Sequence, residues 1–126
     1  MYIEKVSRSV RVAKKIKKEI TNVLRSPRYA AKYSSLNISR VDVSKDLKNA
    51  KIFFTSFDDV LGVASERDYE KDLEKDVFQL RHNLAQVLDM KYVPNVKFFL
   101  DLEKKSHDRL DKIISDIENN QELNDE

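Results

Sequence analysis

Apolar side chains recur at helical spacing over residues 3–25. The repeating positions are Ile3, Val6, Val10, Ala13, Ile16, Ile20, Val23 and Leu24. At about 100° per residue, they share one face of an α-helix. The other face carries Arg8, Arg11, Lys14, Lys15, Lys18 and Arg25. Pro27 ends this helix, because proline lacks an N–H and disfavours helical backbone at Ser26.

A different periodicity follows over residues 36–57. Leu36 and Ile38 alternate with polar residues, as do Val41 and Val43, but the two pairs are out of phase by one residue. A bulge near Ser39–Arg40 would return both pairs to one buried face. The segment "SKDLKN" then predicts a turn, and "AKIFFTSF" predicts a second strand. We therefore expect a β-hairpin, joined to the first helix by the segment "PRYAAKYSS", whose form stays open.

Helical spacing returns from about Glu66, after a loop around Gly62. Its apolar positions are Tyr69, Leu73, Val77, Leu80, Leu84, Val87 and Leu88. The segment "NVKFFLD" predicts a third strand, with Val96, Phe98 and Leu100 on one face and Lys97 and Phe99 on the other. A last helical stripe follows Ser106, a candidate N-cap, at Leu110, Ile113, Ile114 and Ile117.

The element order predicts the fold class. Three short strands cannot bury both of their faces, so the helices should pack on one face of a small sheet. We expect a single α+β domain over residues 1–118 and a disordered acidic tail over residues 119–126.

Composition excludes several classes of protein. The chain has 126 residues and no cysteine, which excludes a disulfide framework and thiolate chemistry. No apolar run is long enough to span a membrane, and no secretory signal is visible. No metal-ligand motif, phosphate-binding glycine loop or nucleophile–base pair is present, so we expect no cofactor, no metal and no enzymatic activity.

The net charge of +2 conceals a strong segregation of charge. Residues 1–33 hold ten Lys and Arg against two acids, whereas residues 58–76 hold eight acids against three basic residues. Glu70–Lys71–Asp72 and Glu74–Lys75–Asp76 mix both signs, as a solvated helix face does. The nearly all-basic face of the first helix instead favours binding to a polyanion.

Three blocks of sequence resemble the ribosome-binding factor A family. The first is "RSVRVAKKIKKEITNVL", which has the family's R-x-x-R-V-A start. The second is "ISRVDVSKDLKNAKIFFTSF", similar to its V-x-V-S-x-D-L-x-x-A-x-V pattern. The third is "LRHNLAQVLDMKYVPNVKFFLD", followed by "RLDKIISDI". Together they cover about Arg8 to Ile117.

This resemblance implies a type II KH-like fold of the order α-β-β-α(kinked)-β, with an additional C-terminal helix. It implies binding to the free small (30S) ribosomal subunit and its 16S rRNA in the cytoplasm, as a monomer. It also implies support of late subunit maturation, including processing of the rRNA 5′ end. Ribosomal proteins and other assembly factors are further partners that it suggests.

The chain departs from the family where the long helix bends. The family bends it at an Ala-x-Gly element, and Asp76, Val77 and Phe78 align there. Nothing in these residues forces a bend, so we expect a mild kink held by packing, or a continuous helix. With one glycine in the chain, a Gly-x-x-Gly clamp on nucleic-acid backbone is excluded.

RNA binding should therefore rest on Lys and Arg side chains against phosphates. The candidates are Arg8, Arg11, Lys14, Lys15, Lys18, Arg40, Lys45, Lys48, Arg81, His82 and Lys91. Phenylalanines of the strands offer rings on which bases could stack, although core packing explains most of them better. The segregated charge also fits a protein-interaction module or a general nucleic-acid binder.

Overall fold

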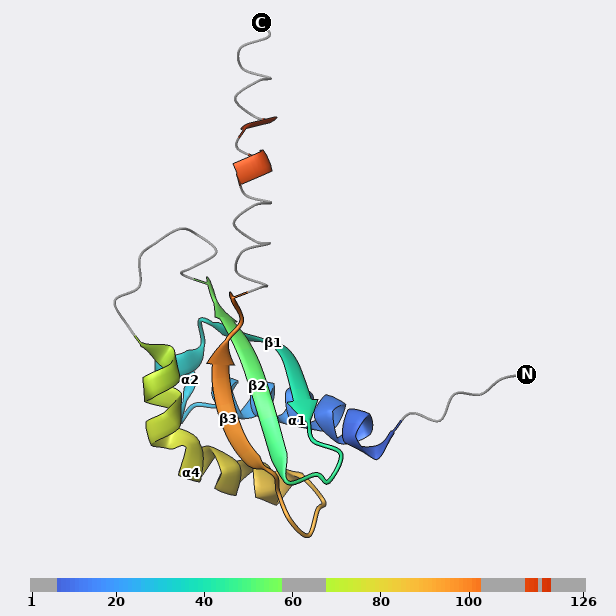
Figure 1. Ribbon diagram of the computed structural model, residues 1–126. Helices are drawn as coiled ribbons and strands as arrows, with labels where there is room; N and C mark the ends of the chain where they lie inside the picture. The colour runs from blue at the N-terminus through green and yellow to red at the C-terminus, as the bar shows by residue number, and fades with distance from the viewer. Residues whose placement is uncertain (1–6, 58–67, 103–112, 116, 119–126) are drawn as a thin grey trace, which may run out of the picture.

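The computed structural model describes residues 7–57, 68–102, 113–115 and 117–118. Its helices are α1 (Arg8–Arg25), α2 (Ala30–Tyr33) and α4 (Tyr69–Val87). Its strands are β1 (Leu36–Val43), β2 (Asn49–Ser56) and β3 (Asn95–Leu100), as Figure 1 shows. The predicted order of helix, hairpin, long helix and third strand is confirmed. α1 ends just before Pro27 as expected, but it begins at Arg8, after the N-cap Ser7, rather than at residue 3; Ile3 and Val6 lie outside the described residues.

The three strands form one sheet in the order β1-β2-β3. β1 and β2 are antiparallel, whereas β2 and β3 are parallel, so α4 provides the crossover between them. The predicted bulge is confirmed. Ile38 pairs with Phe54 and Arg40 pairs with Phe53, which leaves Ser39 as the extra residue of β1. The bulge returns Val41 and Val43 to the side of the sheet that packs on the core.

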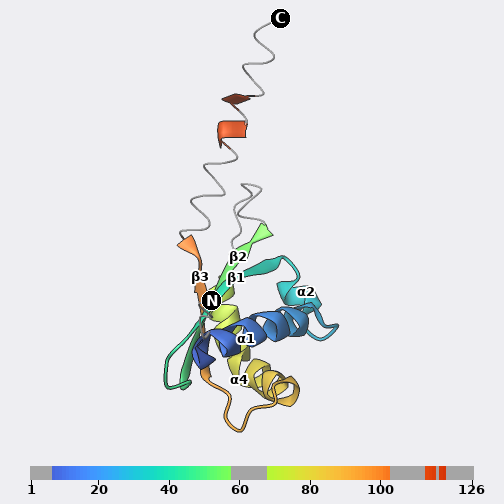
Figure 2. The same ribbon diagram turned by 90° about the vertical axis from the view of Figure 1, so that its right-hand side faces the viewer.

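The core lies between the sheet and the helices, because α1, α2 and α4 all lie on one side of the sheet (Figure 2). α1 buries Ile16, Ile20 and Leu24; α4 buries Leu73, Leu80 and Leu84; the sheet buries Ile52, Phe54 and Phe98. These residues confirm the predicted apolar stripes and the α+β class. Two stripe positions do not belong to the core. Val10 and Val87 are 46% and 49% exposed; Val10 lies in the first turn of α1, and Val87 is the last residue of α4.

The segment between α1 and β1, whose form the sequence left open, contributes to the core. α2 occupies Ala30–Tyr33, and the side chains of Tyr29 and Tyr33 are both buried. Their ring centroids are 6.4 Å apart. The spacing of four residues between these tyrosines is the signal that would have predicted a short helix here.

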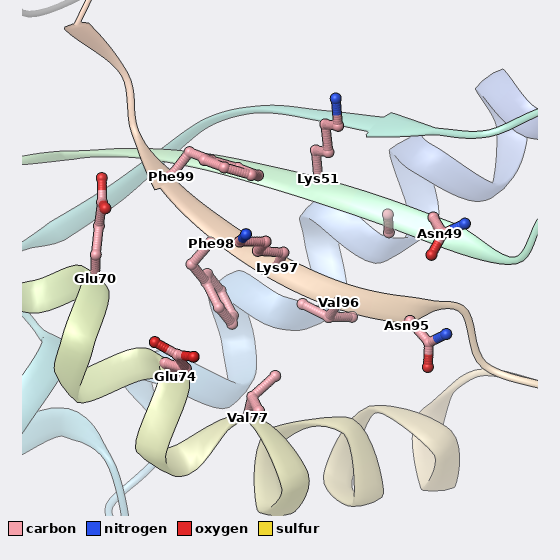
Figure 3. Close-up of a pocket in the computed structure, with 11 residues that line it drawn as sticks. Asn49, Lys51, Glu70, Glu74, Val77, Asn95, Val96, Lys97, Phe98 and Phe99 are labelled. Carbon is pink, nitrogen blue, oxygen red and sulfur yellow. The ribbon is translucent and has the colours of Figure 1, made fainter.

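The long helix bends without breaking. α4 is continuous over Tyr69–Val87, yet its axis changes direction near Val77, as Figures 1 and 3 show. The bend therefore does not require the family's small residue and glycine. Val77 packs against the core, while Phe78 is 75% exposed.

Contacts on the two halves of α4 account for this bend. On the N-terminal half, the Glu70 side chain accepts a hydrogen bond from the backbone N–H of Leu100 in β3, with 2.7 Å between the atoms. In the middle, the Asp76 carboxylate accepts hydrogen bonds from the Tyr33 hydroxyl and from Lys32 Nζ, which both belong to α2. The C-terminal half instead buries Leu80 and Leu84. Because each half is held by different neighbours, packing sets the direction of the axis.

The β1–β2 turn has one feature that the sequence pattern did not predict. Leu47 adopts a φ of 60°, a left-handed conformation that side chains with a Cβ disfavour. Hydrogen bonds hold the turn around it. Asp46 Oδ1 accepts from Ser44 Oγ at 2.6 Å and from the Lys48 backbone N–H at 3.0 Å. The Ser44 hydrogen bond, followed by that of Lys48, lowers the pKa of Asp46 below its ordinary value. The exposed Asp46 carboxylate therefore stays charged to lower pH than that of a free aspartate.

Some predictions fall on other parts of the chain. Residues 113–115 and 117–118 are helical, and Ile113, Ile114 and Ile117 are each about half exposed. The Gly62 loop, the Ser106 N-cap, Leu110 and the tail over residues 119–126 lie outside the described residues. None of the helices that the structure describes combines the length and apolar character needed to cross a bilayer.

Candidate nucleic-acid interface

The outer face of α1 carries the five basic residues predicted from the helical pattern. Arg8, Arg11, Lys14, Lys15 and Lys18 are all exposed. None of the five forms an ion pair with another residue that the structure describes. Their charge is therefore available to an external anion.

The placement of charge along α1 opposes what helix stability alone would favour. Arg8 and Arg11 lie near the N-terminus of α1, and the first turn contains no acid. A cation there faces the positive end of the helix dipole, which is unfavourable. In α4, by contrast, Asp68 caps the helix, and Glu70 and Asp72 lie in its first turn. The basic start of α1 is explained better by an anionic partner than by the stability of the helix.

A groove between α1 and β1 extends this basic face onto the sheet. Its volume is about 360 Å³, and its lining includes Lys14, Lys17 and Arg40. Lys17 Nζ donates a hydrogen bond to the backbone carbonyl of Ser39, at 3.3 Å, and so ties the helix to the bulge. The sequence reasoning missed Lys17, because at helical spacing this residue falls beside the apolar stripe. The signal for it was the cluster of four lysines at positions 14, 15, 17 and 18, around Ile16.

The candidates of the hairpin lie beside the N-terminal end of α1. Lys45 and Lys48 are exposed in the β1–β2 turn, which approaches that end of the helix in both views (Figures 1 and 2). The backbone carbonyl of Lys48 also accepts a hydrogen bond from the N–H of Asn95, at 2.8 Å. The loop before β3 therefore joins the same end of the domain. The fold brings three segments that are distant in sequence to one basic end.

Arg81 has a structural role that the sequence did not reveal. Its Nε donates to the backbone carbonyl of Pro94 at 3.1 Å, and its Nη2 donates to that of Val93 at 2.9 Å. Arg81 is only partly exposed and fastens the α4–β3 loop to the helix. His82 and Lys91 are exposed; His82 Nε2 contacts Gln86 Nε2 at 3.3 Å, and Lys91 Nζ lies 5.6 Å from the Tyr92 ring centroid.

Replacing Arg81 should therefore affect stability more than binding. We expect Arg81→Met to lower the free energy of unfolding by about 1–3 kcal/mol, because it removes two hydrogen bonds from a charged donor. Urea denaturation measures this loss. As a control, Lys91→Met at an exposed site should change the free energy of unfolding by less than about 0.5 kcal/mol. A stable Arg81→Met variant with strongly reduced RNA affinity would instead place Arg81 in the interface.

A second groove separates α4 from β3 (Figure 3). It has a volume of about 670 Å³. Glu70, Glu74 and Val77 line it on the helix side, and its sheet side includes Lys51, Lys97 and Phe99. The two carboxylates would repel a phosphate backbone, so the helix side of this groove is a poor site for polyanions. Among the described residues, no group of side chains has the composition and closeness of a metal site.

The strand phenylalanines divide between the core and the surface. Phe54 and Phe98 are buried, which confirms core packing for these two. Phe57, just after β2, is 60% exposed. Phe53 and Phe99 are half-buried on the face of the sheet that the helices leave open. Their rings stack with centroids 5.5 Å apart.

The sequence model of one protein family, ribosome-binding factor A, matches residues 8–114. The chain belongs to this family. Among curated members, ribosome-binding factor A of Sorangium cellulosum is 28% identical over 112 residues, which cover 89% of this chain and 90% of the relative. The factor of Coxiella burnetii is 33% identical, over an alignment that covers 75% of this chain and 76% of the relative. The factor of Francisella tularensis subsp. novicida is 37% identical, over an alignment that covers 72% of this chain and 61% of the relative.

Solved structures of ribosome-binding factor A share the fold. The crystal structure from Thermus thermophilus has a TM-score of 0.56 at 19% identity, covering 73% of this chain and 93% of the other. The coordinates of a homology model of the Thermus thermophilus factor have also been fitted into a cryo-EM map of a complex with the 30S subunit. They have a TM-score of 0.55 at 18% identity and cover 69% of this chain and 88% of the other. These matches confirm the KH-like α+β architecture that the sequence predicts.

Proposed function

We propose that this protein binds the free small ribosomal subunit through its 16S rRNA and assists the late maturation of that subunit. The observation that carries this proposal is the outer face of α1, where Arg8, Arg11, Lys14, Lys15 and Lys18 point to solvent without ion pairs among the described residues. Several cations on one exposed helix face can neutralise several backbone phosphates at once. Family membership adds support, as does the fitting of the Thermus thermophilus factor into a map of its 30S complex.

Several finer parts belong to the same proposal. The protein acts without catalysis, as a monomer in the cytoplasm, and favours processing of the rRNA 5′ end by holding the RNA in a competent conformation. Lys45 and Lys48 extend the RNA contact from α1, and His82 and Lys91 add to its margin. Because these side chains reach phosphates rather than base edges, recognition depends on the shape of the folded RNA.

Sedimentation tests this proposal. The purified protein is mixed with free small subunits or with complete ribosomes at low salt, and each mixture is separated on a sucrose gradient. We expect the protein to migrate with free small subunits and much less with complete ribosomes. Absence from the subunit fraction at low salt would overturn the proposal. Equal binding to unrelated RNA and DNA would indicate a general nucleic-acid binder instead.

A further inference from the structure

The side of the sheet that faces away from the helices carries a pair of stacked aromatic rings. Phe53 of β2 pairs in register with Phe99 of β3. The ring centroids are 5.5 Å apart and the planes are inclined by 27°. Figure 3 shows that Phe99 and its neighbour Phe98 point to opposite sides of β3, with Phe98 directed toward α4. The Phe53–Phe99 pair is therefore not part of the core beneath the sheet.

Cations lie at both ends of this pair. The Arg40 guanidinium carbon lies 4.0 Å from the Phe53 ring centroid, and Lys97 Nζ lies 5.4 Å from that of Phe99. A row of cation, ring, ring and cation thus crosses all three strands. An acid, Asp42, also lies beside this row, with 3.7 Å between its Oδ2 and Arg40 Nε.

Sheet stability alone does not explain this arrangement. A cross-strand aromatic pair does stabilise a sheet, but like charges placed directly opposite each other destabilise it. Lys51 and Lys97 are such a pair, since they are in register on β2 and β3 and both are exposed. Asp42 of β1 lies in register with Lys51 on its other side and offsets part of this repulsion. One acid thus lies among Arg40, Lys51 and Lys97, so the face keeps an excess of positive charge beside its rings, and an anionic ligand with flat apolar groups would match both features.

We propose that this face binds single-stranded RNA, with an unpaired base stacked on the Phe53–Phe99 pair. Arg40, Lys51 and Lys97 then contact the phosphates on either side of the stacked base. Every base presents a π-face, so binding is tolerant of sequence. The Arg40 side chain, which now covers Phe53, moves aside at small cost, because its ion pair with Asp42 is solvent-exposed on both sides, at 50% and 62%.

This inference takes its ligand class from the proposed function, but it rests on different residues. The outer face of α1 contacts phosphates, so it binds double-stranded and single-stranded RNA alike. The open face of the sheet requires an unpaired base. The two surfaces share no candidate except Arg40, which lines the α1–β1 groove and also covers Phe53.

Fluorescence anisotropy with a short unstructured RNA, and with a duplex of the same length, tests the proposal. Phe99→Leu keeps an apolar side chain but removes the ring. We expect it to weaken single-strand binding by about 5- to 150-fold, the range measured for loss of one base–aromatic stack. Duplex binding and the salt dependence should stay within about twofold of the original, because no charge is removed. Tyr92→Leu is the matched control, since Tyr92 is 76% exposed beside Lys91 but lies alone in a loop.

A spectroscopic probe keeps the test valid even if Phe99→Leu proves unstable. The chain has no tryptophan, so Phe99→Trp introduces a single fluorophore at the stack. Addition of the unstructured RNA should quench its fluorescence, whereas Tyr92→Trp should respond little. Unchanged fluorescence of Phe99→Trp, or equal loss of duplex and single-strand binding in Phe99→Leu, would overturn the inference.

The outcomes also separate this inference from the proposed function. If the protein sediments with small subunits but Phe99→Leu binds single-stranded RNA normally, the proposed function stands and the stacking site is wrong. If Phe99→Leu loses binding to single-stranded RNA but the original protein does not migrate with small subunits, the stacking site is supported and the proposed function is wrong.

Discussion

Neutralising three cations of α1 should weaken binding to the small subunit by about 100-fold at 0.1 M salt. The variant is Arg11→Gln, Lys14→Gln and Lys18→Gln, which keeps good helix-forming side chains on the exposed face. Each phosphate contact releases condensed counterions, so loss of three contacts removes about two to three units from the slope of log affinity against log salt. Titration of the protein with small subunits at several salt concentrations measures both quantities.

A matched pair of double variants provides the control. Lys14→Gln with Lys18→Gln removes two exposed charges from α1, and Lys71→Gln with Lys75→Gln removes two exposed charges from α4. Both pairs change the net charge equally, so a general electrostatic effect would weaken binding equally. We expect the α1 pair to reduce the salt slope and the α4 pair to leave it nearly unchanged. An equal reduction of the salt slope by both pairs would show that α1 is not part of the interface.

Replacing Asp76 with alanine should destabilise the fold by about 1–3 kcal/mol, because it removes the acceptor of a hydrogen bond from a buried tyrosine. Tyr33 is 0% exposed, and its hydroxyl donates to Asp76 in the middle of α4. Asp76 also pairs with Lys32, at 3.3 Å. The carboxylate therefore joins α2 to the helix at the point where the helix bends. Urea denaturation followed by circular dichroism measures the loss.

Three further variants separate the two partners of Asp76. Asp76→Asn retains an oxygen acceptor for Tyr33, so its loss should be smaller. Lys32→Met removes only an ion pair whose Lys32 side chain is 57% exposed, and should cost less than about 1 kcal/mol. Tyr33→Phe with Asp76→Ala should cost less than the sum of the single variants, since both remove the same hydrogen bond. An Asp76→Ala variant as stable as the original would show that packing of Val77 and Leu80 alone holds the bend.

The bend of α4 shows how one geometry can be held by different residues. The family places an Ala-x-Gly element there, and this chain has Asp76, Val77 and Phe78. A glycine permits a bend through its backbone freedom, whereas here Asp76 binds α2 and Val77 packs on the core. The bend therefore belongs to the packing of the fold, and Phe78 tolerates it because its side chain faces solvent.

The sequence by itself determined the elements and the basic face of α1. Apolar periodicity is a local signal, so it located α1, the hairpin with its bulge at Ser39, and the long helix to within a few residues. The separation of Arg11, Lys14 and Lys18 from the apolar stripe was equally visible, because helix geometry alone decides which residues share a face.

Only the tertiary structure decided how residues distant in sequence combine. Arg81 looks like any basic candidate until the loop before β3 folds back and presents two carbonyls to it. Asp76 looks like part of a solvated acidic run until α2 brings Tyr33 against it. Phe53 and Phe99 form a pair because β2 and β3 lie in parallel register, with a whole helix between them in the chain. Such contacts depend on loop closure and sheet register, and no local pattern of residues encodes either one.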